Sequence, residues 1–339
     1  MTGVTNKQVL LAARPVGLPK DSDWRIESAP TRALNAGEVL VKTQYISIDP
    51  TMRGWMNDQD GYLPKLQLGD VMRALAVGEI VESRAEGYAA GEFVHGALGV
   101  QEYAVTPVDG TVKLAKLDLS IAPLESYLNT LGIAGLTAYC GLLRLAEPSP
   151  GKTVLVSGAA GSVGAHVGQI AKLKGCRVVG IAGGPKKCAY VTDVLGFDAA
   201  INYKSDNLFA AIPAHCPDGI DIMFDNVGGD ALTAALISIN LRARVILCGG
   251  ISVYNATAPV PGPASYLMMV GRRARMEGFI YLDYEGEWPA MIREMAGWMS
   301  DGKLSCPDDI TEGGVEVFPQ TLLKLFSGEH LGKLMLKVA

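Results

Sequence analysis

A glycine-rich turn between an apolar run and a helical stretch is the feature that most constrains how this chain can fold. The apolar run Thr153–Ser157 leads into Gly158-Ala-Ala-Gly-Ser-Val-Gly164, and a helix-forming stretch follows. The three glycines allow a tight turn, let the backbone approach a pyrophosphate, and let the helix pack closely on the strand. The helix N-terminus adds amide donors and a positive dipole for the anion. Because position 159 is alanine, the strict Gly-x-Gly-x-x-Gly pattern is absent, and a plain strand-to-helix turn is the alternative. The complete strand–turn–helix context favours a dinucleotide site.

The rest of the chain predicts two kinds of sheet. Before Ile121, short runs such as Val39–Ile48 and Val77–Ser83 alternate with turn residues, which indicates antiparallel strands. From Ser126 onward, continuous apolar runs alternate with helical windows, as in parallel βαβ units. The expected parallel strands are Thr153–Ser157, Arg177–Ile181, Ala199–Asn202, Ile220–Asp225, Arg244–Cys248 and Met276–Phe279.

After these strands we expect a helix over Glu287–Asp301 and a last strand, Leu334–Val338, that returns to the first domain. The predicted fold is therefore α/β, with a doubly wound parallel sheet inserted into a mostly antiparallel β domain. The predicted domains are residues 1–125 with 303–339, and residues 126–302. A length of 339 residues agrees with two domains, because single cores stop growing near about 250–300 residues.

Composition excludes several functional classes. The formal charge is −5 and the Lys and Arg residues are scattered, so the sequence predicts no nucleic-acid partner. No apolar run approaches the roughly 18 residues that span a bilayer, so we expect a soluble, cytoplasmic protein with no membrane partner. The six cysteines form no close pairs and no Cys/His ligand pattern, which argues against disulfides and a structural zinc.

The end of the second parallel strand distinguishes between the two nicotinamide dinucleotides. An NAD site carries an acid about 20 residues beyond the turn, to hold the ribose 2′-hydroxyl. Here the segment Ile181-Ala-Gly-Gly-Pro-Lys-Lys187 has no acid, and Gly183 leaves room beside the lysines at 186 and 187. Two lysines can simply form a solvated helix face, but the missing acid favours a 2′-phosphate and hence NADPH.

Several motifs along the chain together resemble one family, the zinc-free branch of the medium-chain dehydrogenase/reductase superfamily that contains prostaglandin reductases, plant alkenal double-bond reductases and curcumin-reductase-like enzymes. The matching stretches, in family order, are Ile48-Asp-Pro-Thr-Met-Arg-Gly-Trp55, Gly132–Tyr139, Ala159–Gly164, Gln169–Cys176, Phe224–Gly229, Cys248–Asn255 and Leu331-Gly-Lys333.

The resemblance implies a GroES-like N-terminal domain, a Rossmann domain and an NADPH site. Lys187 and Tyr203 correspond to the family's 2′-phosphate contacts, and further residues correspond to the nicotinamide half. The expected cofactor-binding residues are Thr137, Gly158, Ala160, Gly161, Ser162, Val163, Gly164, Gly183, Lys187, Tyr203, Asn226, Cys248, Gly249, Gly250, Ile251, Ser252, Tyr254, Phe279, Ile280, Tyr281 and His330.

Three departures separate this chain from related patterns. Thr51 stands where the family usually has tyrosine, so we expect one aromatic wall of the substrate pocket to be missing. His330 replaces the family's asparagine before Leu331-Gly-Lys333, which leaves that cofactor contact open between a ligand and a packing residue. Zinc-dependent relatives need Cys and Gly-His-Glu where this chain has Ser47-Ile-Asp-Pro and Leu68-Gly-Asp-Val71, so no metal is expected.

Without a catalytic metal, hydride must go to a carbon that is already polarised, so the expected substrate is a small-molecule activated alkene, an enone or enal. Tyr254, on a loop beyond a parallel strand, is the first candidate for stabilising the enolate oxygen or relaying a proton, against the alternative of a core tyrosine. Tyr62 is the second candidate, as a pocket wall.

The sequence leaves two alternative functions open and predicts one oligomeric state. A quinone reductase on the same scaffold and a non-catalytic NADPH-binding protein remain alternatives, since fold alone does not fix chemistry. We also expect a homodimer, mainly from the resemblance, with edge strands near Pro259–Met269 pairing, because this stretch is apolar and rich in proline.

Overall fold

The computed structural model describes residues 3–338 and divides the chain into two compact units. Unit 1 comprises residues 1–128, 308–330 and 334–339, and unit 2 comprises residues 129–307 with 331–333. Each unit thus takes in a piece of the C-terminal region, and each is described here by itself.

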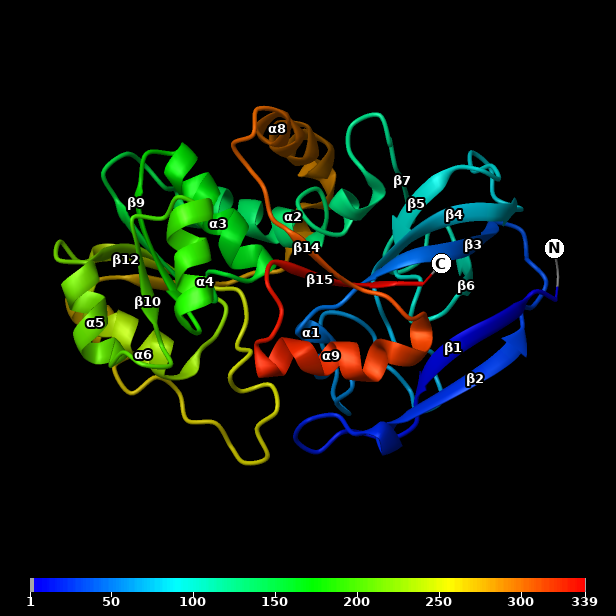
Figure 1. Ribbon diagram of the computed structural model, residues 1–339, viewed down its shortest axis with the longest axis horizontal. Coiled ribbons are helices and arrows are strands. Elements are labelled where there is room, and N and C mark those ends of the chain that lie inside the picture. The colour runs from blue at the N-terminus through cyan, green and yellow to red at the C-terminus, as the bar shows by residue number, and fades with distance from the viewer. Residues whose placement is uncertain (1–2, 339) are drawn as a thin grey trace. The chain divides into compact units, whose positions relative to one another are not determined.

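Unit 2 is a parallel sheet with helices on both faces (Figure 1). Its strands are β8 (Thr153–Ser157), β9 (Arg177–Ala182), β10 (Ala199–Asn202), β11 (Ile220–Asp225), β12 (Ile239–Leu247) and β13 (Arg275–Gly278). Its helices are α2 (Ile133–Tyr139), α3 (Ser162–Leu173), α4 (Pro185–Ala189), α5 (Leu208–His215), α6 (Gly229–Ile237), α7 (Met268–Arg272) and α8 (Trp288–Ser300). Shorter helical turns are η3 (Cys140–Ala146), η4 (Tyr190–Val194) and η5 (Tyr281–Glu287).

The alternation of side chains across the strands builds this core. Leu155, Val179 and Met223 face α5 and α6 in one buried apolar cluster. Their strand neighbours Val154 and Val178 are equally buried on the opposite face, where α3 packs on β8 and β9. Burial of both faces explains why these strands are continuous apolar runs in the sequence.

The strand order of unit 2 fixes where a ligand can bind. The order is β10-β9-β8-β11-β12-β13, so the chain winds outward in one direction from β8 and then in the other from β11. Neighbouring connections therefore leave the sheet on opposite faces at the carboxyl ends of β8 and β11. Such a reversal point opens the crevice where doubly wound sheets bind their ligands.

Unit 1 is built around an antiparallel sheet of order β14-β15-β3-β4-β5-β7, with β6 also paired to β3. Its strands are β1 (Thr5–Leu11), β2 (Trp24–Pro30), β3 (Glu38–Ser47), β4 (Ala76–Ser83), β5 (Phe93–Gly96), β6 (Tyr103–Pro107), β7 (Ala115–Lys116), β14 (Asp308–Thr311) and β15 (Lys333–Lys337). Its helices are α1 (Thr51–Trp55) and α9 (Phe318–Ser327), with turns η1 (Asp21–Asp23), η2 (Leu124–Tyr127) and η6 (Val315–Val317).

The C-terminus completes unit 1, as the sequence predicts. Strand β15 lies between β14 and β3, and Leu336 pairs with Ile46 in antiparallel register. Helix α9 contributes Phe318, whose ring meets that of Trp24 edge to face at 5.3 Å. Both rings belong to the same buried cluster as the inner face of β3.

Two sequence-based expectations need correction. Strand β12 begins at Ile239 rather than Arg244, because a register irregularity with a left-handed Arg242 (φ 62°) interrupts the pairing without ending the strand. The stretch Pro259–Met269 contains no edge strand: it is a loop that leads into α7, and the edge of the sheet is β13. Its prolines lack the amide hydrogens that a strand pairing needs.

Candidate functional site

The glycine turn after β8 is tight and brings the start of α3 close to the strand. Gly158 has a φ of 62°, in the left-handed region that favours glycine. A Cβ at position 164 would lie 2.3 Å from the carbonyl oxygen of Gly158, so only glycine lets α3 approach the strand this closely. Ala160 is buried, while Gly161, Ser162 and Val163 at the start of α3 are partly exposed. The turn therefore presents the amides of a helix N-terminus at the reversal point of the sheet.

A buried polar network ties the ends of β8 and β11 together. The Ser157 hydroxyl donates to the Asp225 carboxylate at 2.6 Å, and the Asn226 side-chain amide donates to the Ser157 carbonyl at 2.7 Å. The amides of Val227 and Gly228 also donate to the Asp225 carboxylate. Burial raises the pKa of Asp225, and the hydrogen bonds from Ser157 and Gly228 oppose that rise. The network holds Asn226 beside the glycine turn.

The end of β9 brings together two of the residues expected at a 2′-phosphate. A Cβ at position 183 would lie 2.8 Å from the ring of Tyr203, so Gly183 leaves space that this half-exposed tyrosine covers. The Gly184 amide donates to the Asn202 side chain at 2.7 Å, which joins the ends of β9 and β10. Lys187 follows in the short helix α4 and is partly buried.

The loop after β12 folds back over the end of β11. The amides of Cys248 and Gly249 donate to the Asp225 carbonyl, at 2.8 and 3.2 Å. The Gly250 amide donates to the Tyr254 hydroxyl oxygen at 3.1 Å, so the phenol is held against the glycine pair. Ile251 and Ser252 continue the loop, with amides bonded to the Asn226 and Val227 carbonyls. Burial raises the pKa of the Cys248 thiol to about 12, so this thiol is neutral.

Four further residues of unit 2 were expected to contact the cofactor: Thr137, Phe279, Ile280 and Tyr281. Phe279 follows β13 and packs edge to face on Phe224 of β11, at 6.3 Å between ring centroids. Thr137 is partly buried on α2, which packs on α3. Ile280 caps η5, whereas Tyr281 is buried and stacks on Trp288 of α8 at 5.3 Å. The Tyr281 ring therefore serves packing against α8.

The C-terminal motif divides between the units. His330 belongs to unit 1, where its Nδ1 lies 3.2 Å from the Lys324 carbonyl oxygen. Residues 331–333 belong to unit 2, and the Gly332 amide donates to the Ala160 carbonyl at 3.0 Å. Gly332 also forms a parallel bridge with Gly161. The structure thus brings the residue two positions after His330 onto the glycine turn, and the cofactor role of His330 itself stays a prediction.

Sequence reasoning missed three residues that support this site. Ser157 and Asp225 link the ends of β8 and β11 by a side-chain hydrogen bond. Each is the polar last residue of an apolar run, and that position could have marked it in the sequence. His166, fully buried on α3, lies 2.9 Å from the Thr130 hydroxyl through Nε2 and 2.6 Å from the Ser162 carbonyl through Nδ1. No local pattern marked this histidine, since its partners come from separate turns.

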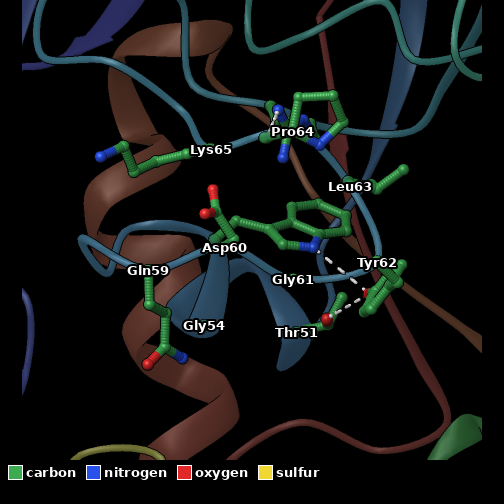
Figure 2. Close-up of a pocket in the computed structure, with 11 residues that line it drawn as sticks. Thr51, Gly54, Gln59, Asp60, Gly61, Tyr62, Leu63, Pro64 and Lys65 are labelled. Carbon is green, nitrogen blue, oxygen red and sulfur yellow. Dashed lines mark hydrogen bonds between the residues drawn. The ribbon is translucent and has the colours of Figure 1, made fainter.

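Unit 1 has a pocket of its own, of about 210 Å³ (Figure 2). It is lined by Thr51, Gly54, Trp55, Gln59, Asp60, Gly61, Tyr62, Leu63, Pro64, Lys65 and Arg73. Tyr62 lines this pocket, and its hydroxyl is 2.8 Å from that of Thr51; its role as a wall of the substrate pocket stays a prediction. Trp55 lines the pocket as well, and the loss of one aromatic wall of the substrate pocket at Thr51 stays a prediction.

Residues 3–338 hold neither a cluster of metal ligands nor a helix that could span a membrane. Within that range no group of three or more His, Cys, Asp or Glu side chains is arranged to hold a metal ion. No helix there combines the length and the apolar character needed to cross a bilayer. The six cysteines, all in this range, are free thiols.

A doubly wound sheet with a glycine turn at its reversal point defines a dinucleotide-binding protein of the Rossmann class. Comparison with known proteins refines this class. A family model described as the N-terminal domain of oxidoreductase matches residues 7–114, and one described as zinc-binding dehydrogenase matches residues 162–297.

Full-length relatives cover both units. The NADPH-dependent curcumin reductase of Escherichia coli is 41% identical, over 98% of this chain and 97% of its own length. The 2-alkenal reductase (NADP(+)-dependent) of Nicotiana tabacum is 37% identical, over 99% and 98%. The crystal structure of CurA from Vibrio vulnificus in complex with NADPH superposes with a TM-score of 0.91 at 36% identity, over 98% of this chain and 99% of that one. The chain belongs to the medium-chain dehydrogenase/reductase superfamily, in its branch of prostaglandin, alkenal and curcumin reductases.

Proposed function

We propose that this protein is an NADPH-dependent reductase of the carbon–carbon double bond in α,β-unsaturated ketones and aldehydes. The observation that carries the proposal is full-length similarity to relatives named as curcumin and 2-alkenal reductases, joined to a glycine turn at the reversal point of the sheet. Unit 2 is the cofactor domain in this proposal. Residues 1–125 with 303–339 are the substrate domain.

The residues of unit 2 fit the cofactor. Gly164 lets α3 approach the turn closely, and the N-terminus of α3 would supply amides to the pyrophosphate. Gly183 lets the Tyr203 ring pack against the end of β9, and Lys187 would neutralise the charge of a 2′-phosphate there. NADPH, when bound, supplies the hydride that adds to the β-carbon of the alkene.

The loop after β12 and the residue after β13 complete the other half of the site. We assign the segment Cys248–Ser252, together with Asn226, Phe279 and Thr137, to the nicotinamide side. Asn226 and the loop support this assignment, since hydrogen bonds to the ends of β8 and β11 hold both of them. A rigid wall keeps the reacting carbon at a fixed distance and excludes water.

Tyr254 carries the main catalytic role in the proposal. The Gly250 amide donates to the phenol oxygen at 3.1 Å and fixes its position, and a phenol can both accept and donate a hydrogen bond. Donation to the developing enolate oxygen would stabilise the product of hydride addition. Tyr254→Phe keeps the ring and removes this donor, so turnover should fall about tenfold to hundredfold while NADPH affinity is retained.

The control for this experiment is Tyr103→Phe, because Tyr103 lies on β6 of unit 1, outside the proposed site and the proposed dimer patch. Single-turnover kinetics separate hydride transfer from binding, and fluorescence titration gives the NADPH affinity. A fully active Tyr254→Phe enzyme with an unchanged pH profile would reduce Tyr254 to a packing residue.

The reaction class itself is tested by NADPH consumption over a panel of enals, enones, phenylpropanoid ketones and quinones. The proposal requires product in which the double bond is reduced and the carbonyl is retained. Quinone turnover without alkene reduction would favour a quinone reductase on the same scaffold. NADPH binding without any turnover would favour a non-catalytic protein.

We also propose a cytoplasmic homodimer. Val260, Tyr266, Leu267 and Val270 are all exposed apolar residues close to the free edge strand β13, and such patches mark contacts. Sedimentation at micromolar concentration should give twice the chain mass of 35.8 kDa. A monomer under these conditions would refute the dimer, and Leu267→Asp should produce monomers if the patch is the interface.

A further inference from the structure

Four Asp-Gly dipeptides occur in this chain, and such a dipeptide lets an aspartate side chain react with its own main chain. Glycine has no Cβ, so its amide nitrogen can approach the carboxyl carbon of the preceding aspartate. The structure separates the dipeptides that can do so in the folded protein from those that cannot. The four are Asp60-Gly61, Asp109-Gly110, Asp218-Gly219 and Asp301-Gly302.

The reaction needs only water, and its atoms balance. The glycine nitrogen bonds to the aspartate Cγ, and the carboxyl OH leaves with the amide proton as water. The succinimide ring that results then adds water back. When the ring opens at the main-chain carbonyl of the aspartate, the product is isoaspartate, whose main chain runs through the former side chain. The main chain is then one carbon longer, and the mass of the protein is unchanged.

Two of the four dipeptides are locked, because the glycine amide already has an acceptor. The Gly219 amide donates to the Cys216 carbonyl at 2.9 Å, and the Gly302 amide donates to the Met299 carbonyl at 2.9 Å. Both glycines also have a positive φ, of 80° and 68°, as parts of turns. Ring formation must first break these hydrogen bonds, so both sites are protected although their aspartates are exposed.

The dipeptide Asp60-Gly61, in the loop after α1, has no such restraint. Both residues are exposed, and within residues 3–338 neither the Asp60 carboxylate nor the Gly61 amide takes part in a hydrogen bond. A Cβ at position 61 would meet no atom within 4 Å, so the backbone has room to turn. Figure 2 shows both residues on the loop that lines the pocket of unit 1. The nitrogen and the carboxyl carbon are therefore free to meet.

The dipeptide Asp109-Gly110 lies between these cases. Its glycine amide has no acceptor in the described part of the chain, but Gly110 is half-buried. A Cβ at position 110 would lie 3.4 Å from the Pro107 ring, so the backbone has less room than at position 61. We expect this site to react second.

The loop that carries the first site is anchored at both ends. The Arg14 guanidinium donates to the Met56 carbonyl at 3.0 Å and to the Leu66 carbonyl at 2.6 Å. Inside these anchors, Lys65 and Asp58 form an ion pair at 2.8 Å. The dipeptide lies between the anchors and belongs to neither. A longer main chain there reshapes the loop while unit 1 stays folded.

We propose that Asp60 is a modification site at which the folded protein forms isoaspartate spontaneously. The proposal is independent of the reductase function, since it concerns the main chain of unit 1 alone. The modified loop keeps its anchors and gains one carbon in the segment that lines the pocket. The pocket of an aged molecule therefore differs in shape from that of a new one.

Peptide mapping of protein incubated for several weeks at neutral pH tests the proposal. Chromatography separates isoaspartyl peptides from their aspartyl forms, and electron-transfer dissociation locates the residue. Isoaspartate at residue 60 should exceed that at residues 218 and 301 by about tenfold or more, because a hydrogen bond must open first at the latter two. In urea-unfolded protein this difference should vanish. Equal amounts at the three residues in the folded protein overturn the proposal, as does modification of residue 60 only after unfolding.

Gly61→Ala is the test variant, because alanine fits the open space while its Cβ hinders attack on Asp60. Gly54→Ala is the matched control, since a Cβ at that exposed position also meets no atom within 4 Å. After incubation, a protein isoaspartate methyltransferase with labelled S-adenosylmethionine should label the wild type and Gly54→Ala alike, and Gly61→Ala severalfold less. Urea unfolding curves verify that both variants are folded. Equal labelling of all three proteins contradicts the assignment to Asp60.

Discussion

The buried histidine beneath the glycine turn makes the stability of this protein depend on pH in a specific range. His166 is fully buried, and burial lowers its pKa to about 4, from an ordinary value of 6.5. Its two ring nitrogens are satisfied in the neutral form, with Nδ1 donating to the Ser162 carbonyl and Nε2 accepting from the Thr130 hydroxyl. The folded protein therefore resists protonation of a group that the unfolded chain protonates readily.

The sign and size follow from proton linkage. Because the folded pKa is the lower one, the unfolded state takes up the proton first as pH falls. The stabilisation is fully present above pH 6.5 and is lost as the pH falls from there to about 4. The two pKa values correspond to about 3 kcal/mol in total, of which about 2 kcal/mol is lost by a pH of about 5.

Urea unfolding of the wild type and of His166→Gln at about pH 8 and about pH 5 measures this effect. The variant loses packing at both pH values, so each protein is compared with itself. The free energy of unfolding at the higher pH is the reference for the value at the lower pH. The decrease between the two pH values should be smaller in the variant by about 2 kcal/mol. An equal decrease in the two proteins would refute the assignment of a neutral, buried His166.

Three further outcomes are expected. Lys187→Ala should lower the preference for NADPH over NADH about tenfold while turnover with NADH persists. The control Lys186→Ala changes an exposed side chain and should leave the preference within about twofold. Equal specificity constants for the two cofactors in the wild type would contradict the 2′-phosphate site. Gly168→Ala should destabilise unit 2 by roughly 1–3 kcal/mol in urea unfolding, because the Cβ of the new alanine would lie 1.7 Å from the buried Phe197 ring. Unchanged stability would show that the ring moves freely. Metal analysis should find no stoichiometric zinc, and chelators should leave NADPH consumption unchanged; one zinc per chain lost together with activity would overturn the zinc-free assignment.

The sequence predicted the parallel sheet well because burial on both faces leaves an unbroken apolar run. Strands β8, β10 and β11 begin and end at the predicted residues. The start of β12 was missed because the irregularity at Arg242 breaks the apolar pattern but not the strand. The edge strand expected near Pro259–Met269 is β13, whereas the stretch itself is a loop, because its prolines lack the amide hydrogens that strand pairing needs.

Site residues next to the glycine turn were predictable because the motif and the strand end fix them locally. Contacts that join distant segments were not: the hydrogen bond from Ser157 to Asp225 spans 68 positions in the chain. The sequence showed that Thr51 departs from the family. It could not show that the hydroxyl of Thr51 meets that of Tyr62, since this depends on how the loop after α1 folds back.

The placement of β15 has a consequence for how the protein is made. Ribosomes deliver the chain from the N-terminus, and domains generally fold as units during synthesis. Residues 129–307 of unit 2 are contiguous and can condense as soon as they emerge. The sheet of unit 1 begins with earlier residues but must wait for β15, which lies between β14 and β3 and follows residues 129–307 in the chain. The nascent chain therefore carries an incomplete antiparallel sheet while all of residues 129–307 are being made.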